Sequence, residues 1–143
     1  MIKDLLIAAL GTAGCTVTYY ENDQLANVKL DALAPDDVCG MVIEPTTGVF
    51  EVKGNGVQPR YSPHIVEIIK QVKPEDTADN NYATLDALMS VSIAFVNALM
   101  KTGSFKKIGS TPFTKITERK YDANVIGWSI ALNIQPITNS LNC

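Results

Sequence analysis

The sequence predicts an α+β fold in which a mainly antiparallel sheet packs against one long helix, with a short helix at the N-terminus. Residues 121–135 alternate as a strand does, with bulky apolar side chains on one face and small or polar ones on the other. Residues 79–101 instead repeat apolar side chains at helical spacing over the longest stretch of the chain. A strand with one apolar face needs a helix across it, so the two segments predict two packed layers.

Length, charge and cysteine content limit the functional classes. A chain of 143 residues forms one domain, which we place at 1–143, with a core large enough to need no disulfide or metal. Its 12 basic and 15 acidic residues give a net charge of −3, and no basic block indicates sequence-specific binding of nucleic acid. The three cysteines, Cys15, Cys39 and Cys143, lack the spacing of a disulfide framework or a zinc site.

The first ten residues predict a short amphipathic helix that ends at Gly11 or Gly14. The apolar side chains of its core-facing stripe are Ile2, Leu5, Leu6 and Ala9. The alternative is a lipoprotein signal in which Cys15 becomes acylated. Asp4 in place of a basic head and Thr12 in place of leucine argue against that alternative.

The next third of the chain predicts short strands and a protruding hairpin at about residues 42–60. Thr16–Tyr20 predicts a strand, and the loop that follows, residues 21–37, includes a possible strand near Val28–Leu30. Val38–Glu44 and Gly48–Val52 predict two strands that pair around a turn at residues 45–48. Glycines and a proline then predict a flexible tip or bulged loop over Lys53–Arg60.

The second half of the chain predicts a strand at His64–Val72, the long helix, and further strands. The helix is apolar on both sides, but only about sixteen residues separate Leu85 from Met100, whereas a membrane span needs about twenty, so we expect no membrane crossing.

After the long helix, Ser104–Gly109 and Phe113–Lys120 predict strands, the second at a sheet edge. In the final strand, we expect Trp128 in the core and the small-residue face against water or a neighbouring subunit.

The residues able to carry chemistry are few, and each has a structural explanation that we favour. His64, the single histidine, has no acidic or cysteine neighbour at ligand spacing. The acidic groups Asp36–Asp37 and Glu75–Asp76 match no calcium-loop spacing, and residues 54–56 lack the context of a phosphate-binding loop. We therefore expect no enzyme activity, cofactor or metal. An enzyme or small-ligand binder would require a deep pocket at His64 or Asp36.

The order of elements resembles the tail-terminator or tail-completion family of tailed bacteriophages, which are small head-to-tail joining proteins. The resemblance covers nearly the whole chain. Its parts are the short helix (1–10), the strand and hairpin group (16–52), the strand ending near Val72, the long helix (79–101) and a terminal strand pair closing with residues 122–134.

The resemblance implies a homo-oligomeric ring, six-fold or twelve-fold, in the neck or tail of the virion, assembled in the host cytoplasm. Other virion connector and tail proteins would stack above and below it, and genomic DNA would pass through without sequence-specific contact. The acidic net charge suits a channel that must not hold phosphates. We expect Phe50 and Val52 on the hairpin, and Ile137 and Leu141 in an extended C-terminal tail at about 136–143, to contact neighbouring subunits.

Overall fold

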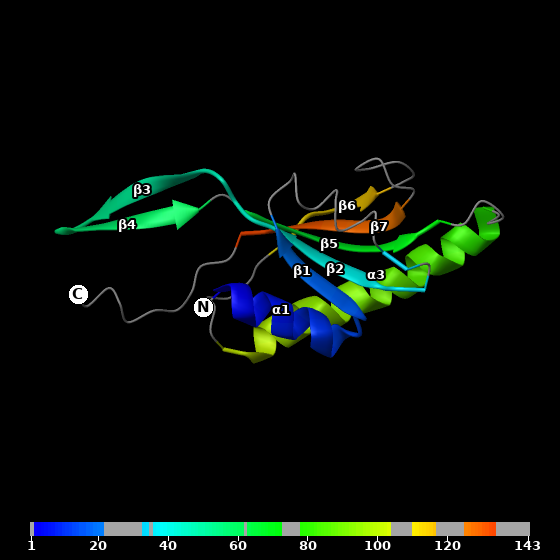
Figure 1. The fold of residues 1–143 in the computed structure, drawn as a ribbon. Helices are drawn as coiled ribbons and strands as arrows, with labels where there is room; N and C mark the ends of the chain where they lie inside the picture. Colours follow the sequence, from blue (N-terminus) through cyan, green and yellow to red (C-terminus); the bar gives the residue numbers. More distant parts are fainter. Residues whose placement is uncertain are drawn as a thin grey trace.

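The computed structural model describes residues 2–21, 33–34, 36–61, 63–72, 78–103, 110–116 and 125–133. This part of the chain contains one mixed five-stranded sheet, a separate two-stranded hairpin, a short N-terminal helix and a long helix (Figure 1). The predicted α+β class, with a mainly antiparallel sheet against one long helix, is confirmed. The elements are α1 (Ile2–Ala13), β1 (Val17–Glu21), β2 (Cys39–Ile43), β3 (Gly48–Lys53), β4 (Gly56–Tyr61), β5 (His64–Gln71), α3 (Ala78–Lys101), β6 (Phe113–Ile116) and β7 (Val125–Leu132).

The sheet has the order β1-β2-β5-β7-β6, in which β1 and β2 are parallel and the other neighbours antiparallel. The two central strands, β5 and β7, are also the longest, and they pair along their whole length from His64 opposite Leu132 to Gln71 opposite Val125. Among the described strands, the short strand β6 pairs only with β7 and lies at the edge. The edge position predicted for Phe113–Lys120 is therefore confirmed over the four residues of β6.

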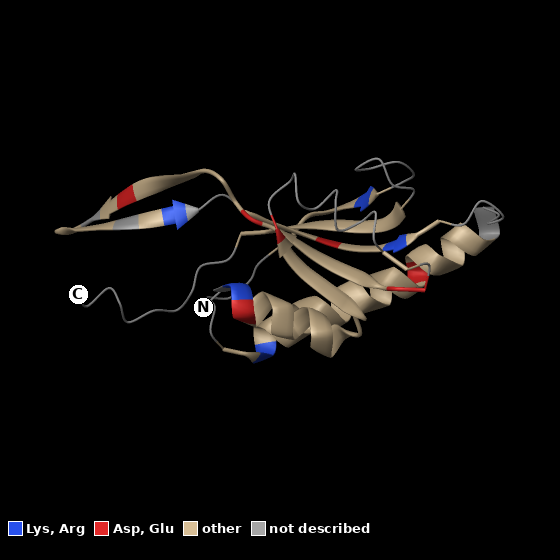
Figure 2. Cartoon of the chain, in the orientation of Figure 1, with Lys and Arg blue, Asp and Glu red and all other residues tan. Residues whose placement is uncertain are grey.

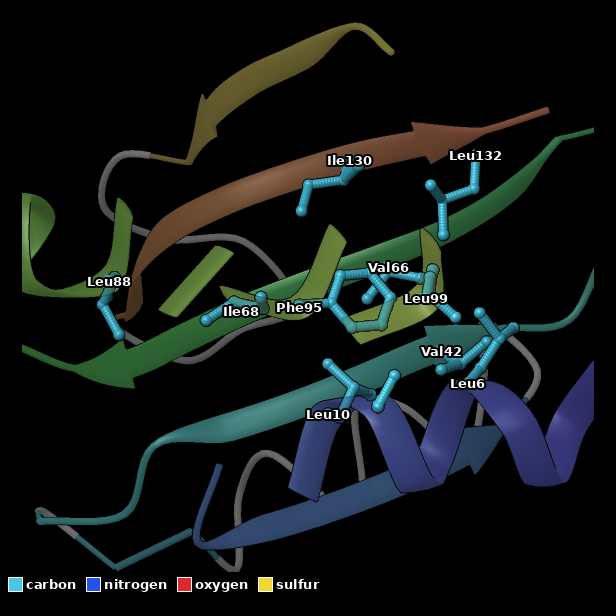
Figure 3. Packing of buried hydrophobic residues seen from close by; sticks show 11 residues of the cluster. Leu6, Leu10, Val42, Val66, Ile68, Leu88, Phe95, Leu99, Ile130 and Leu132 are labelled. Carbon is cyan, nitrogen blue, oxygen red and sulfur yellow. The ribbon is translucent and has the colours of Figure 1, made fainter. Parts of the chain in front are cut away.

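Both helices cover the same face of the sheet, and the main core lies between the two layers (Figure 1). Helix α1 packs along β1 and β2, while α3 packs along β5 and β7 and also against α1. In Figure 3, Leu6 and Leu10 from α1 and Phe95 from α3 point toward the sheet side chains Val66 and Ile130. Phe95 and Leu6 are fully buried, as the helical spacing predicts, and Leu10, which lies outside the predicted stripe, is fully buried as well.

The opposite face of the sheet is also largely buried, with the fully buried Glu67 among apolar side chains, which corrects the expectation for the final strand. Val125, predicted to face water or another subunit, is fully buried together with Met41 and Ile69. The prediction is wrong because it considered the final strand without the strands that lie beside it in the sheet. In the sheet, Ile65 and Ile69 of β5 and Ile116 of β6 lie beside the small residues of β7, and β2 adds Met41 to the same buried cluster.

The hairpin is present, but its strands are paired differently from the prediction. β2 lies inside the sheet between β1 and β5, and β3 pairs with β4 instead. The prediction of a flexible tip or bulged loop over Lys53–Arg60 is therefore wrong for residues 56–60, which form most of β4. The turn is the two-residue connection Gly54-Asn55, where Gly54 has a φ of 59°. A two-residue turn with glycine in a left-handed conformation matches the twist of a β-hairpin.

Several predictions lie outside the described residues. They are the strands near Val28–Leu30 and at Ser104–Gly109, and the C-terminal tail with Ile137 and Leu141. Helix α1 runs through Gly11 to Ala13, and Gly14, the second of the two glycines expected to end it, follows with a φ of 113°. The Cys15 amide then donates to the Leu10 carbonyl, which satisfies one of the carbonyls at the helix end.

Candidate interaction surfaces

The β3–β4 hairpin extends away from the body of the protein (Figure 1). Its two strands pack on each other and make no comparably extensive contact with another element. The pairing register puts Phe50, Val52, Val57 and Pro59 on one face, because Phe50 lies opposite Pro59 and Val52 opposite Val57. All four side chains are exposed, Phe50 by 80%. An isolated two-stranded hairpin is marginally stable in water, so this apolar face needs a partner.

The other face of the hairpin carries an ion pair that links its two strands. The Arg60 Nη1 donates to Glu51 Oε1 at 2.8 Å, diagonally across the two strands. Both side chains are partly exposed, so this pair contributes at most about 1 kcal/mol. It gives the hairpin a charged face and an apolar face, and the apolar face carries Phe50 and Val52, the two residues that the sequence indicates as interface residues.

A second apolar surface is a groove of about 280 Å³ between α3 and the β6 edge of the sheet. It was not predicted from the sequence. The residues that line it are Met89, Ser92, Ile93, Val96, Asn97, Thr111, Phe113, Trp128 and Ile130. None of these residues carries a charge. Ile93 and Phe113 project into solvent beside the groove, with 56% and 57% of their surface exposed.

The Trp128 indole forms one wall of this groove and joins its two sides. Its Nε1 donates to the Leu85 carbonyl of α3 at 3.0 Å. Its ring meets Phe113 of β6 edge to face, with centroids 5.4 Å apart and an interplanar angle of 86°. Trp128 is only half-buried, so the prediction that it lies in the core holds for the side that packs against the main cluster and not for the groove side.

The groove has a geometric cause. Packed helices lie about 8–10 Å apart, whereas neighbouring strands lie about 4.8 Å apart, so two helices cover about four strands. This sheet has five strands. With α1 along β1 and β2, and α3 along β5 and β7, the helix-side face of β6 is left without a full layer. Phe113 lies on that face because it pairs with Ile130, a residue of the helix-side core.

Helix α3 also meets the length and composition of a membrane span over Asn80–Lys101, with a mean hydropathy of 1.6. In the structure, however, it packs along the sheet and α1 and buries Leu88, Phe95 and Leu99. Its outward side leaves Ile93 and Met100 more than half exposed. This distribution is that of a core helix with one side available to a partner.

No group of three or more histidine, cysteine or acidic side chains that could hold a metal ion occurs among the described residues. His64 is buried on the helix-side face at the start of β5, opposite Leu132. Asp37 has a structural role, because its carboxylate accepts hydrogen bonds from the Ala34 amide at 3.1 Å and from the Thr16 hydroxyl at 3.4 Å. The groove does not reach either His64 or Asp36.

His64 makes the stability of the fold depend on pH. Burial lowers its pKa below the ordinary 6.5, and the nearby Glu44 carboxylate opposes this only in part. Below about pH 6.5, the unfolded chain therefore binds a proton at this residue that the folded chain does not, and stability falls as the pH falls. We expect the urea midpoint to drop from pH 7.5 to 5.5 by less in His64→Gln than in the wild type. Equal drops in the two proteins contradict the prediction.

The thiols of Cys15 and Cys39 should be chemically inert in the folded protein. Burial raises the pKa of Cys15 to about 11 and that of Cys39 to about 12, with smaller contributions to Cys39 from Cys15, Asp37 and Glu67. Thiolate, the reactive form, is then scarce at pH 8. In a Cys143→Ser variant, we expect iodoacetamide at pH 8 to label neither thiol until urea unfolds the chain. Rapid labelling of the folded variant would contradict this.

No family model, curated protein or solved structure matches the chain. The functional proposal therefore depends on the order of elements and on the two apolar surfaces described above.

Proposed function

We propose that this chain is a structural virion protein that forms a ring in the head-to-tail connector or neck of a tailed bacteriophage, in the manner of a tail terminator. The observation that carries the proposal is the hairpin β3–β4, whose apolar face is exposed and makes no extensive contact with another helix or strand that the structure describes. A symmetric assembly of identical subunits supplies such a partner to every copy at once. The proposed ring is homo-oligomeric, six-fold or twelve-fold, and stacks between other connector and tail proteins.

The charge of the chain is consistent with a channel through which DNA passes without sequence-specific contact. The chain has a net charge of −3, and the described lysines and arginines lie on separate elements (Figure 2). Tight DNA binding requires several basic side chains gathered on one surface, because each neutralised phosphate adds to the affinity. The described residues present no such surface, which is consistent with a wall that lets DNA pass, the property that a connector needs. In this proposal the protein is not an enzyme and holds no cofactor.

The packing of α1 favours this proposal over a lipoprotein acylated at Cys15. Maturation of such a lipoprotein cleaves the chain immediately before the acylated cysteine, which would remove α1. Leu6 and Leu10 of α1 are fully buried against β2 and α3, and losing both side chains would expose the core. Burial of the Cys15 thiol, which raises its pKa to about 11, also opposes its acylation in the folded protein.

Native mass spectrometry of the full chain over a range of concentrations tests the proposal. We expect a closed species of six or twelve subunits that grows at the expense of monomer as concentration rises. A strict monomer at every concentration contradicts the homo-oligomeric ring. The same spectra test the lipoprotein, since acylation adds a lipid-sized increment to the mass of each chain.

A further inference from the structure

We infer that the apolar face of the β3–β4 hairpin of one copy seats in the α3–β6 groove of the next copy. The inference depends on the proposed ring and specifies the contact that builds it. The hairpin face is Phe50, Val52, Val57 and Pro59. The groove face is centred on Ile93 of α3, Phe113 of β6 and Trp128 of β7.

The hairpin face and the groove are complementary in width, and both are free of charged residues. The groove lies where the helix layer ends and β6 has no full cover, and a two-stranded hairpin is about 10 Å wide, the width of one missing helix. Neither the hairpin face nor the groove lining includes a charged residue. Seating one on the other therefore buries apolar area without desolvating a charge.

The hairpin cannot reach and fill the groove of its own chain. It extends from the ends of β2 and β5, beyond the pair His64–Leu132, and away from the body (Figure 1). The groove instead lies along the middle of α3 and the strand pair β6–β7. A contact between different patches on successive copies is head-to-tail, and it generates a closed ring when the rotation between copies closes.

The size of the contact explains why a closed assembly, rather than an open pair, is expected. Each hairpin strand has six residues, so the ribbon is about 20 Å long and its face covers on the order of 200 Å². One hairpin seated in one groove buries about twice that area in total, well below the roughly 1,200 Å² of a stable pair. An open pair leaves one hairpin and one groove empty, whereas a closed ring fills all of them, so assembly through this contact is cooperative.

Cross-linking tests the contact directly, in a Cys143→Ser background. One protein carries Val52→Cys on the hairpin, a second carries Ile93→Cys beside the groove, and the two are mixed under air oxidation. We expect disulfide-linked pairs made of one copy of each protein. The matched control replaces Ile93→Cys with Ala87→Cys, an exposed position about 120° around the same helix and outside the groove lining, and should give few such pairs.

Charge substitution gives an independent measurement. Phe50→Asp and Ile93→Asp each place one unpaired charge in the proposed contact, and we expect each to raise the concentration for half-assembly by about thirtyfold or more. Both side chains are more than half exposed, so thermal unfolding of the monomer should change little. If the wild type is a strict monomer, the ring itself is wrong. If the wild type forms rings that both Asp variants also form, without the cross-link, the ring stands and the hairpin–groove contact is overturned.

Discussion

A Gly127→Ala variant is expected to lose about 2–6 kcal/mol of unfolding free energy, although it adds a single methyl group. Gly127 lies in the central strand β7, opposite Ile69 of β5 and Ile116 of β6. A Cβ built there would lie 2.0 Å from the Ile68 carbonyl oxygen and 2.8 Å from the Ile69 Cα. Both atoms belong to the backbone of β5, so no side chain can rotate away to make room.

Two physical effects add at this position. The φ of Gly127 is 157°, outside the range that residues with a Cβ adopt readily, and holding such a conformation costs about 1–3 kcal/mol. Forcing an extra methyl group into a packed site costs about 1–3 kcal/mol more. Since a domain of this size has about 5–15 kcal/mol of stability, the variant should be marginal or unfolded at 37 °C.

Gly11→Ala is the matched control. Gly11 lies in α1, is exposed, and has no atom within 4 Å of a built Cβ. Alanine in a helix is favoured over glycine by about 0.5–1 kcal/mol, so this variant should be slightly more stable than the wild type. Urea unfolding followed by circular dichroism measures both variants. Equal stability of Gly127→Ala and the wild type would contradict the strand geometry at β7.

The two-layer architecture could be predicted because its signals are local. Alternation along β7 and the helical spacing of Leu88, Phe95 and Leu99 each indicate one element and one buried face. The burial of Val125 could not be predicted, because its cause is the apolar cluster that other strands supply on that face, including Met41 of β2, Ile69 of β5 and Ile116 of β6. One strand of a sheet does not indicate what its neighbours place on its second face.

The sequence predicts the wrong partner for β3 because Gly54, Gly56 and Pro59 interrupt the strand pattern. Proline removes an amide donor, which is tolerated on the outer side of a two-stranded ribbon. The available signal was Gly54-Asn55, a two-residue turn flanked by Val52 and Val57, which pair across it. The interface residues Phe50 and Val52 were still placed on the hairpin, since they lie in β3 under either pairing.

The groove could not be predicted from the sequence, because it depends on the number of strands that two helices can cover. Phe113 and Ile93 are far apart in the chain, and only the sheet order brings β6 beside the uncovered side of α3. Trp128 was expected in the core for its size and pattern. Its half-exposed position follows from its place in β7, next to the edge strand, where the helix layer ends.

Truncation of Phe95 is expected to be the second most damaging change that we consider. Phe95 is the largest of the fully buried side chains and packs at the centre of the helix-to-sheet cluster (Figure 3). Phe95→Ala removes its contacts and leaves a cavity that the β5 and β7 side chains cannot fill, at a cost of about 3–5 kcal/mol. The melting temperature should fall by roughly 10 °C, and the monomer should become partly unfolded at 37 °C.

Phe50→Ala is the matched variant, because it makes the same chemical change on a side chain that is 80% exposed. Measured at a concentration where the protein is monomeric, its stability should lie within about 0.5 kcal/mol of the wild type. At higher concentration it should instead lose assembly, which Phe95→Ala affects only through unfolding. The comparison of the two variants thus distinguishes a side chain that stabilises the subunit from one that contacts a neighbouring subunit. If Phe50→Ala destabilised the monomer as much as Phe95→Ala, the hairpin would be part of the core and its apolar face would not be available to a second copy.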